Sequence, residues 1–304
     1  MNLRVKISHY TYLCIGFTKA YFLLLRSILQ KKCYFGPFVG EFGHLLSHIV
    51  PFISYLHSKG IKVYYCGPAI HKPFFYDNMG NLIVESYLEL RDFYNEVLPN
   101  ANDQNYPEDV ELDILRFVKS AKSSHLAFWD IRNSRFYFNV FCKWEYFNSF
   151  VKIYSKRQSS FESSESNVVV FARNKGSYSP VRGDDWNFQE LVDYIKDFVD
   201  RVYVLGHPAF SHDIQGNENV EVILTNDNSI IIEKCLKSKF IINQLSGTHY
   251  LGLYCNTRVI LLLKGHIDYS NVNKDFKYRK KLGPNYDWSI VNSLESLKEI
   301  VSRN

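Results

Sequence analysis

Apolar and polar positions alternate in a regular order over the second half of the chain. Five short runs are mainly apolar and predict buried β-strands. They lie at residues 167–173, 201–206, 220–224, 239–244 and 258–263. The segments between them predict helices by their apolar spacing. These helices lie at residues 187–200, 228–238 and 247–255. Apolar strands that alternate with helices are typical of a parallel sheet covered on both faces, so this half predicts a doubly wound α/β domain.

The first half opens in a similar way and then changes. Residues 33–39 and 61–68 predict strands, and residues 41–60 predict a helix that ends at Gly60. Beyond Tyr76 the pattern is mainly helical and aromatic, and it predicts no order of elements.

A Ser-rich, charged segment at residues 154–166 lacks periodic apolar residues and predicts a linker. We therefore expect two Rossmann-like doubly wound α/β domains, at residues 1–155 and 156–304, that face each other across a cleft. Ligands of open parallel sheets bind beyond the carboxyl ends of the strands, so candidate site residues are sought at those ends.

The composition excludes several classes of protein. The 304 residues are 46% apolar and 22% charged, as in ordinary soluble globular proteins. The net charge of +5 comes without a long basic block, so we expect no nucleic-acid partner. The six cysteines form no CxxC pair and lie mostly in apolar runs, which predicts buried free thiols and a reducing cytoplasm. The histidines lack a metal-binding spacing, so we expect no metal and no other cofactor.

The N-terminal segment "YTYLCIGFTKAYFLLLRSILQKK" is apolar and basic at once. Lys19 and Arg26 interrupt it, so no apolar stretch reaches the roughly 18–20 residues of a spanning helix. Two interpretations stay open. The segment is either an interfacial amphipathic helix that makes peripheral contact with a membrane, or a helix packed on the protein's own surface.

Three cations converge where the first strand of the second domain ends. In "FARNKGSYSPVRGDDWNFQELV", Arg173 and Lys175 follow the strand, and Arg182 precedes the helix that begins near Asn187. An arginine can bind two phosphate oxygens at once, and a lysine adds a point charge. The segment therefore predicts a phosphate site, although a solvated loop with local ion pairs would have the same composition.

A second candidate anion site follows a later strand of the same domain. The strand ends at Gln244, and Ser246 and Gly247 open the next helix. A helix start leaves backbone N–H groups without partners, and glycine lets a ligand approach the backbone. His249 lies in the first turn and is expected to touch the same ligand. His207 follows another strand end and is expected to face the cleft.

The glycine-rich segment "GPFVGEFGHLLSHIVPFISYL" is the candidate catalytic part of the first domain. Gly40 stands beside Glu41, and His44 follows one turn later. The glycine suggests close approach of the backbone to a ligand. A carboxylate or imidazole facing the cleft could act as a general base, so Glu41 and His44 are the catalytic candidates. The pattern does not decide between a base and a residue that orients the substrate.

Three segments together resemble a known family. "GPFVGEFGHLL" resembles an opening motif of bacterial surface-polysaccharide glycosyltransferases. "FARNKGSYSPVRGDDW" and "NQLSGTHYLGLYCNTRVILL" are similar to two segments of GT-B-type glycosyltransferases, the second of them a donor-site segment. The chain departs from these motifs in two places. Asp184, Asp185 and Trp186 stand where the family has an Asn-Trp pair, and His44 stands where the opening motif often has Trp.

The resemblance implies a nucleotide-sugar donor in the second domain and a glycan or lipid-linked acceptor in the first. By resemblance, the three cations would hold the diphosphate, Ser246, Gly247 and His249 would hold the nucleotide side, and Glu41 would lie at the acceptor face. The resemblance also implies that the reaction takes place in the cytoplasm, at the inner face of a membrane. Three alternatives stay open: a transferase of another activated group such as pyruvyl, a nucleotide-sugar epimerase, and a carbohydrate- or membrane-binding module without catalysis.

Overall fold

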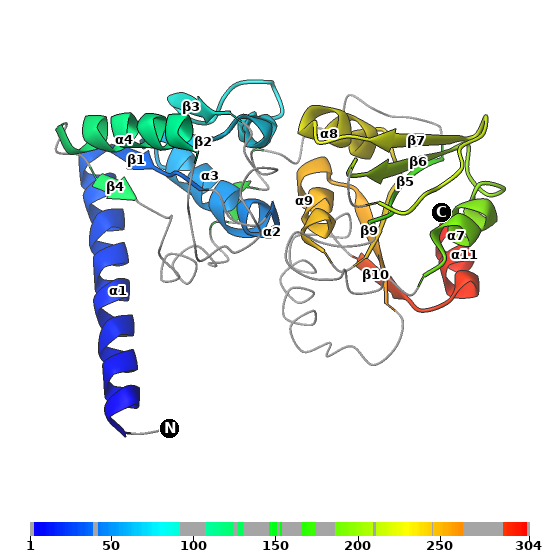
Figure 1. Cartoon of the computed structure of the whole chain (residues 1–304), viewed down its shortest axis with the longest axis horizontal. Helices are drawn as coiled ribbons and strands as arrows, with labels where there is room; N and C mark the ends of the chain where they lie inside the picture. Colours follow the sequence, from blue (N-terminus) through cyan, green and yellow to red (C-terminus); the bar gives the residue numbers. More distant parts are fainter. Residues whose placement is uncertain are drawn as a thin grey trace. The chain divides into compact units, whose positions relative to one another are not determined.

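The computed structural model describes most of the chain. The described residues are 3–38, 42–91, 107–123, 127–129, 146, 148–150, 153, 166–173, 186–208, 211–244, 246–263 and 288–302. The chain divides into two compact units, Met1–Ile153 and Tyr154–Asn304 (Figure 1), and each is described by itself. The predicted linker lies outside the described residues except for Ser166. The division between a donor domain and an acceptor domain, and the cleft between them, stay predictions.

A six-stranded parallel sheet forms the centre of the second unit. Its strands in chain order are β5 (Asn167–Phe171), β6 (Arg201–Gly206), β7 (Val220–Leu224), β8 (Phe240–Gln244), β9 (Arg258–Leu262) and β10 (Trp288–Val291). Their order across the sheet is β10-β9-β8-β5-β6-β7. The chain therefore builds from β5 outward to β7 and then returns to place β8 on the other side of β5. The five predicted strands are confirmed, and β10 was not predicted.

Helices cover both faces of this sheet. On one face, α7 (Phe188–Ile195) and α11 (Leu294–Ser302) pack against alternate strand residues such as Val168, Val170 and Val204. Figure 1 shows α8 (Asn228–Leu236) and α9 (Leu251–Cys255) on the opposite face. All five residues of β5 are buried, as expected for a strand with helices on both sides. The doubly wound arrangement is confirmed.

The helix starts also follow the sequence pattern. The Asn187 side chain accepts a hydrogen bond from the Glu190 N–H at 3.2 Å, and Asp227 caps α8 through the Ser229 N–H at 2.8 Å. The helix predicted over 187–200 ends earlier, at Ile195, and turns follow it.

A smaller parallel sheet forms the centre of the first unit. Its strands are β1 (Lys32–Phe35), β2 (Lys62–Pro68), β3 (Ser86–Leu90) and β4 (Ala127–Trp129), in the order β3-β2-β1-β4. The predicted strand at 33–39 is shorter than expected, because β1 ends at Phe35. Strands β3 and β4, the helix α4 (Glu108–Ser123) and the 3-10 helix Ala69–Phe75 were not predicted.

The predicted helix over residues 41–60 is interrupted in the structure. It consists of α2 (Phe42–His44), a π-helical segment (Leu45–Ile49) and α3 (Val50–Ser58). Gly60 follows with a φ of +67°, in the left-handed region that glycine adopts at helix ends.

The N-terminal helix α1 (Leu3–Gln30) has 28 residues. Near its C-terminal end it buries Ala20, Leu24 and Ser27, and it contacts β1 and β4. Among the described residues, no helix is apolar over a length sufficient to cross a bilayer. The predicted free thiols are confirmed for five cysteines, but Cys14 on α1 is exposed while the other four are buried.

Candidate functional site

The strand order of the second unit reverses between β5 and β8. These two strands are neighbours and pair in parallel, with Val170 beside Ile242. Two residues further along lie Ala172 and Gln244. Arg173 comes next after Ala172 and forms a backbone bridge with Ser211. In doubly wound folds the point where strand order reverses opens a crevice at the carboxyl ends of the strands, and ligands bind there. Arg173 and Gln244 flank this point.

Both residues carry a buried hydrogen-bond donor. Nε of Arg173 and Nε2 of Gln244 are buried and have no hydrogen-bond partner among the residues that the structure describes, and Gln244 as a whole is only 1% exposed. Burial lowers the pKa of the Arg173 guanidinium below its ordinary value, although an arginine keeps its charge in proteins. Buried donors are normally satisfied, and leaving one unsatisfied is unfavourable by about 1–3 kcal/mol. Donors of this kind suit an anionic ligand.

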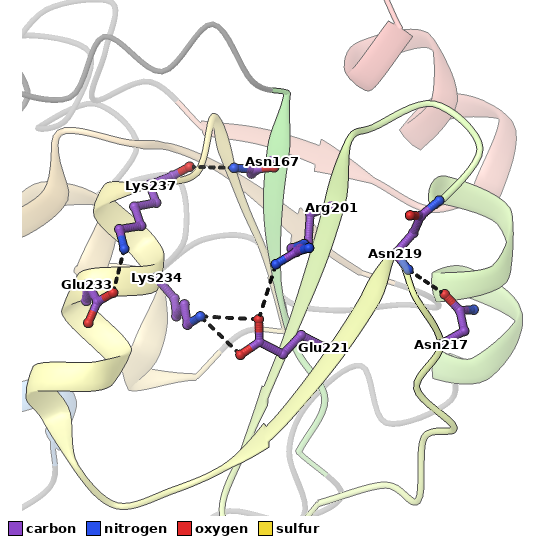
Figure 2. A network of polar contacts seen from close by, with 8 residues as sticks. All are labelled: Asn167, Arg201, Asn217, Asn219, Glu221, Glu233, Lys234 and Lys237. Carbon is purple, nitrogen blue, oxygen red and sulfur yellow. Dashed lines mark hydrogen bonds and ion pairs between the residues drawn. The ribbon is translucent and has the colours of Figure 1, made fainter.

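The charged side chains at the amino ends of the same strands differ from Arg173 because they form ion pairs. At the amino ends of the strands, Figure 2 shows Glu221 between Lys234 and Arg201. Lys234 Nζ lies 3.1 Å from Glu221 Oε1, and Arg201 Nη1 lies 3.9 Å from Oε2. Lys237 pairs with Glu233 at 2.6 Å. Each of the three cations drawn there therefore has a carboxylate partner, whereas Arg173 forms no ion pair with any residue that the structure describes.

The start of the segment after β8 is held by a group of polar side chains. Asn243 Nδ2 donates to Thr248 Oγ1 at 2.7 Å, and Ser246 Oγ lies 2.6 Å from the same oxygen. Ser246 stands at the helix start but its side chain caps no N–H group. The segment begins as a 3-10 turn, Gly247–Tyr250, and continues as α9. The predicted donation from Ser246 to a ligand stays a prediction, because its hydroxyl has partners within the protein.

Asn243 and Thr248 were not among the predicted residues. Both are buried, at 0% and 3% exposed. The available signal was a polar Asn-Gln pair at the end of an otherwise apolar strand. Such a pair is expected only where hydrogen bonds or a ligand satisfy it.

His249 is packed into the same segment. Its ring stacks on Trp288 with centroids 5.1 Å apart, and its Nδ1 bonds the carbonyl oxygen of Ser246. The residue is 6% exposed. Its orientation is therefore fixed by the fold. Trp288 was not predicted as part of the site.

His207 follows β6, the other neighbour of β5. It is half-buried, and its carbonyl oxygen accepts a hydrogen bond from Ser211 Oγ at 3.0 Å. A Cβ atom at Gly206 would lie 2.2 Å from that Oγ, so glycine is required for this turn. The predicted residues of the second unit that the structure describes thus lie at or just beyond the carboxyl ends of β6, β5 and β8. They are Arg173, His207, Gln244, Ser246, Gly247 and His249. Lys175 and Arg182 lie outside the described residues.

The catalytic candidates of the first unit are described only in part. Gly40 and Glu41 lie outside the described residues, whereas His44 is half-buried at the end of α2. The His44 ring meets the ring of His48 edge-on, with centroids 5.2 Å apart. Burial, with the charge of His44 as a smaller cause, lowers the pKa of His48 to about 3. His48 is therefore neutral at neutral pH.

Ser47 lies beside His48. Its Oγ donates to the carbonyl oxygen of Gly43 at 2.6 Å and also contacts His48 Nδ1. This pair of histidines was not predicted. His48 lies on a π-helical segment, and such segments are frequent at functional sites. No group of three His, Cys, Asp or Glu side chains that could hold a metal ion is found in the described part of the chain.

Comparison with known proteins gives matches only at the level of structure. No protein-family model matches the chain, and no curated protein matches its sequence. E. coli heptosyltransferase WaaC with ADP-2-deoxy-2-fluoro heptose has a TM-score of 0.52 at 12% identity, over 90% of this chain and 99% of that one. WaaC with ADP has a TM-score of 0.50 at 10% identity, over 90% and 99%. The glycosyl transferase family 9 protein from Veillonella parvula has a TM-score of 0.45 at 11% identity, over 90% and 88%.

At identities this low, the likeness concerns the fold alone. It covers nearly the whole of both chains and so includes both α/β units. Together with the two parallel sheets, it shows that this chain has a Rossmann-like two-unit fold of the GT-B type.

Proposed function

We propose that this protein is a glycosyltransferase that moves a sugar from a nucleotide-sugar donor to a surface polysaccharide or a lipid-linked glycan. One observation carries the proposal. Arg173 and Gln244 present buried, unsatisfied donors on either side of the point where the strand order reverses. The diphosphate of an activated sugar is an anion that suits these donors.

In the proposed reaction, the side chains at the carboxyl ends of β5 and β8 have an electrostatic role. An acceptor hydroxyl attacks the anomeric carbon and loses its proton, while the bond from that carbon to the diphosphate breaks. The leaving diphosphate takes the electron pair, and a fixed guanidinium stabilises its growing negative charge. Lys175 and Arg182 belong to the connection between β5 and α7 and are proposed to add to this charge.

The first unit is proposed to receive the acceptor. Glu41 or His44 would take the proton from the attacking hydroxyl or orient it. The neutral His48, whose ring meets that of His44, adds no positive charge there. The heptosyltransferase structures support the choice of donor class, since those proteins were captured with ADP and with an ADP-heptose analogue. We propose the cytoplasm as the place of this reaction.

The test compares Arg173, at the carboxyl ends of the strands, with Arg201, at the amino ends of the same sheet. Binding of ADP, UDP, GDP and CMP, and of their sugar derivatives, is measured by calorimetry for the full chain. The variant Arg173→Met is expected to lose about tenfold to a hundredfold in affinity for the bound nucleotide, because a charge-assisted bond is removed. Arg201→Met serves as the control, since Arg201 pairs with Glu221 at the amino ends of the strands.

The stability of Arg173→Met shows whether weaker nucleotide binding reflects a damaged fold. Arg173→Met removes a buried Nε donor that has no hydrogen-bond partner among the described residues, so the free energy of unfolding should rise by about 1–3 kcal/mol. Weaker binding would then not reflect a damaged fold. Nucleotide affinity that is equal in Arg173→Met and in the parent chain would contradict the proposal.

Product analysis separates the alternatives. A glycosyltransferase releases free nucleotide and lengthens the glycan. An epimerase changes the donor sugar without an acceptor, and a transferase of another activated group leaves nucleotide-sugars unused. A binding module gives calorimetric heat but no product.

A further inference from the structure

Helix α1 exposes an apolar face where a surface helix normally exposes a polar one. Ile15, Phe22, Leu25 and Leu29 are 64%, 60%, 54% and 74% exposed. Their spacing places them along one side of the helix, which we call the α1 stripe. The side that carries Ala20, Leu24 and Ser27 is buried and faces β1 and β4. Helix α1 is thus apolar both toward its own unit and away from it. Contiguous apolar patches on soluble proteins mark interaction sites.

The charge of this region is of one sign. The first 40 residues contain six of the 36 Lys and Arg residues and none of the 31 Asp and Glu residues. They therefore carry more than the net charge of +5 of the whole chain. On α1 itself, Lys19 and Arg26 stand seven residues apart, each one turn after a stripe residue, so they follow one flank of the stripe.

The charge decides between two kinds of occupant. A second copy of this chain would bring an equally basic segment against the stripe, and like charges at close range oppose that contact. An anionic lipid surface complements the charge and also accepts the apolar side chains. A helix of this kind lies in the plane of the interface with its apolar face about 5–10 Å deep. The stem of Lys19 can lie along that face with its ammonium group among the lipid head groups.

We propose that the α1 stripe docks this protein onto a membrane surface that contains anionic lipids. The helix lies on the bilayer and does not cross it. The proposal does not depend on the proposed transfer reaction, because it uses none of the residues assigned to the donor or the acceptor.

Vesicle co-sedimentation of the full chain tests the proposal. Vesicles of phosphatidylcholine alone are compared with vesicles that also contain phosphatidylglycerol. The protein is expected to bind the anionic vesicles and to dissociate as salt is raised, because exposed charges are screened. The variant Ile15→Asn/Phe22→Asn/Leu29→Asn is expected to bind at least about a hundredfold more weakly, since three apolar side chains no longer leave water.

The controls use another helix of the same unit. Leu112 and Leu115 on α4 are 48% and 51% exposed, so Leu112→Asn/Leu115→Asn removes exposed apolar groups elsewhere and should leave vesicle binding unchanged. Lys19→Glu should weaken binding to anionic vesicles by about tenfold, and Lys119→Glu on α4 should not. Circular dichroism shows whether each variant is folded.

Two results would overturn the proposal. One is that the full chain fails to bind anionic vesicles at low salt. The other is that the full chain forms dimers without lipid which the triple variant does not form, and that both bind vesicles equally. The second result would assign the α1 stripe to a second copy of the chain.

Discussion

At the scale of single residues, the unsatisfied donors at the reversal of strand order are unfavourable for the stability of the chain by itself. Arg173, just after β5, and Gln244, at the end of the neighbouring strand β8, each hold a buried donor with no partner among the described residues. Residues placed to bind a ligand often lower the stability of the protein that lacks it. This reasoning separates Arg173 from Lys234 and Arg201, which lie at the opposite edge with Glu221 as their counter-ion (Figure 2).

Two histidines, the buried His71 and the half-buried His48, make the stability of the first unit depend on pH. Burial lowers the pKa of His48, and also that of His71, from the ordinary 6.5 to about 3. Between these values the unfolded chain binds more protons than the folded one, so the free energy of unfolding falls as pH falls. We expect a slope of about 1.4 kcal/mol per pH unit for each histidine. The stabilisation is complete above pH 6.5 and is lost toward pH 3.

Urea unfolding of the full chain between pH 6.5 and 5 measures this slope, because most carboxylates stay ionised there. His71→Leu should reduce the contribution of the two histidines by about half. His57→Leu is the control, since His57 is exposed at the end of α3 and meets water in both states. A slope that is unchanged in His71→Leu would show that this histidine accepts a proton in the folded chain.

At the scale of elements, one glycine determines how closely β1 and β2 approach. Gly36 follows β1 with a φ of +120°, and a Cβ atom there would lie 2.3 Å from the carbonyl oxygen of Cys66 on β2. Gly36→Ala is therefore expected to lower the free energy of unfolding by about 3 kcal/mol or more. Gly60 also has a positive φ, of +67°, but nothing lies within 4 Å of its Cβ position. Gly60→Ala should lower it by only about 1 kcal/mol.

Chemical denaturation of the two variants measures both free energies. Equal losses for Gly36→Ala and Gly60→Ala would show that the strands can separate at little cost. Gly36 also begins the connection that leads from β1 to Gly40 and Glu41, which stay predicted site residues.

The same scale shows how far the sequence predicts the fold. Strands β5, β6, β8 and β9 were predictable because they are buried on both faces, which leaves a run of mainly apolar letters. Strand β7 lies at the end of the sheet and buries only Val220, but four of its five residues are apolar. Strand β3 was not, since three of its five residues are exposed and its pattern has no apolar run. The π-helical segment Leu45–Ile49 was not predictable either, because its apolar spacing is close to that of an α-helix.

The candidate site was predictable where it depends on topology. The position of Arg173 and Gln244 follows from the strand ends alone, and the structure adds that their donors are unsatisfied. The bonds among Asn243, Ser246 and Thr248, and the stacking of His249 on Trp288, depend on side-chain packing between distant segments. A single sequence does not show which side chains of distant segments pack together.

At the scale of the whole molecule, the two proposals assign different ligands to different units. The nucleotide is proposed to bind the second unit, and the membrane surface is proposed to bind α1 in the first. If both assignments hold, each ligand should protect its own set of backbone amides from hydrogen exchange. The nucleotide with the strongest calorimetric binding is expected to protect residues 171–173 and 242–249. Anionic vesicles are expected to protect residues 11–30.

Hydrogen exchange of the full chain with each ligand alone gives a result that separates the two proposals. Protection of the first unit by the nucleotide would contradict the assignment of the donor to the second unit and leave the docking of α1 standing. If vesicles protected only residues outside α1, the result would contradict the docking and leave the donor site standing. The variant Ile15→Asn/Phe22→Asn/Leu29→Asn should keep the nucleotide protection unchanged, because its substitutions lie in the first unit and the nucleotide is proposed to bind the second.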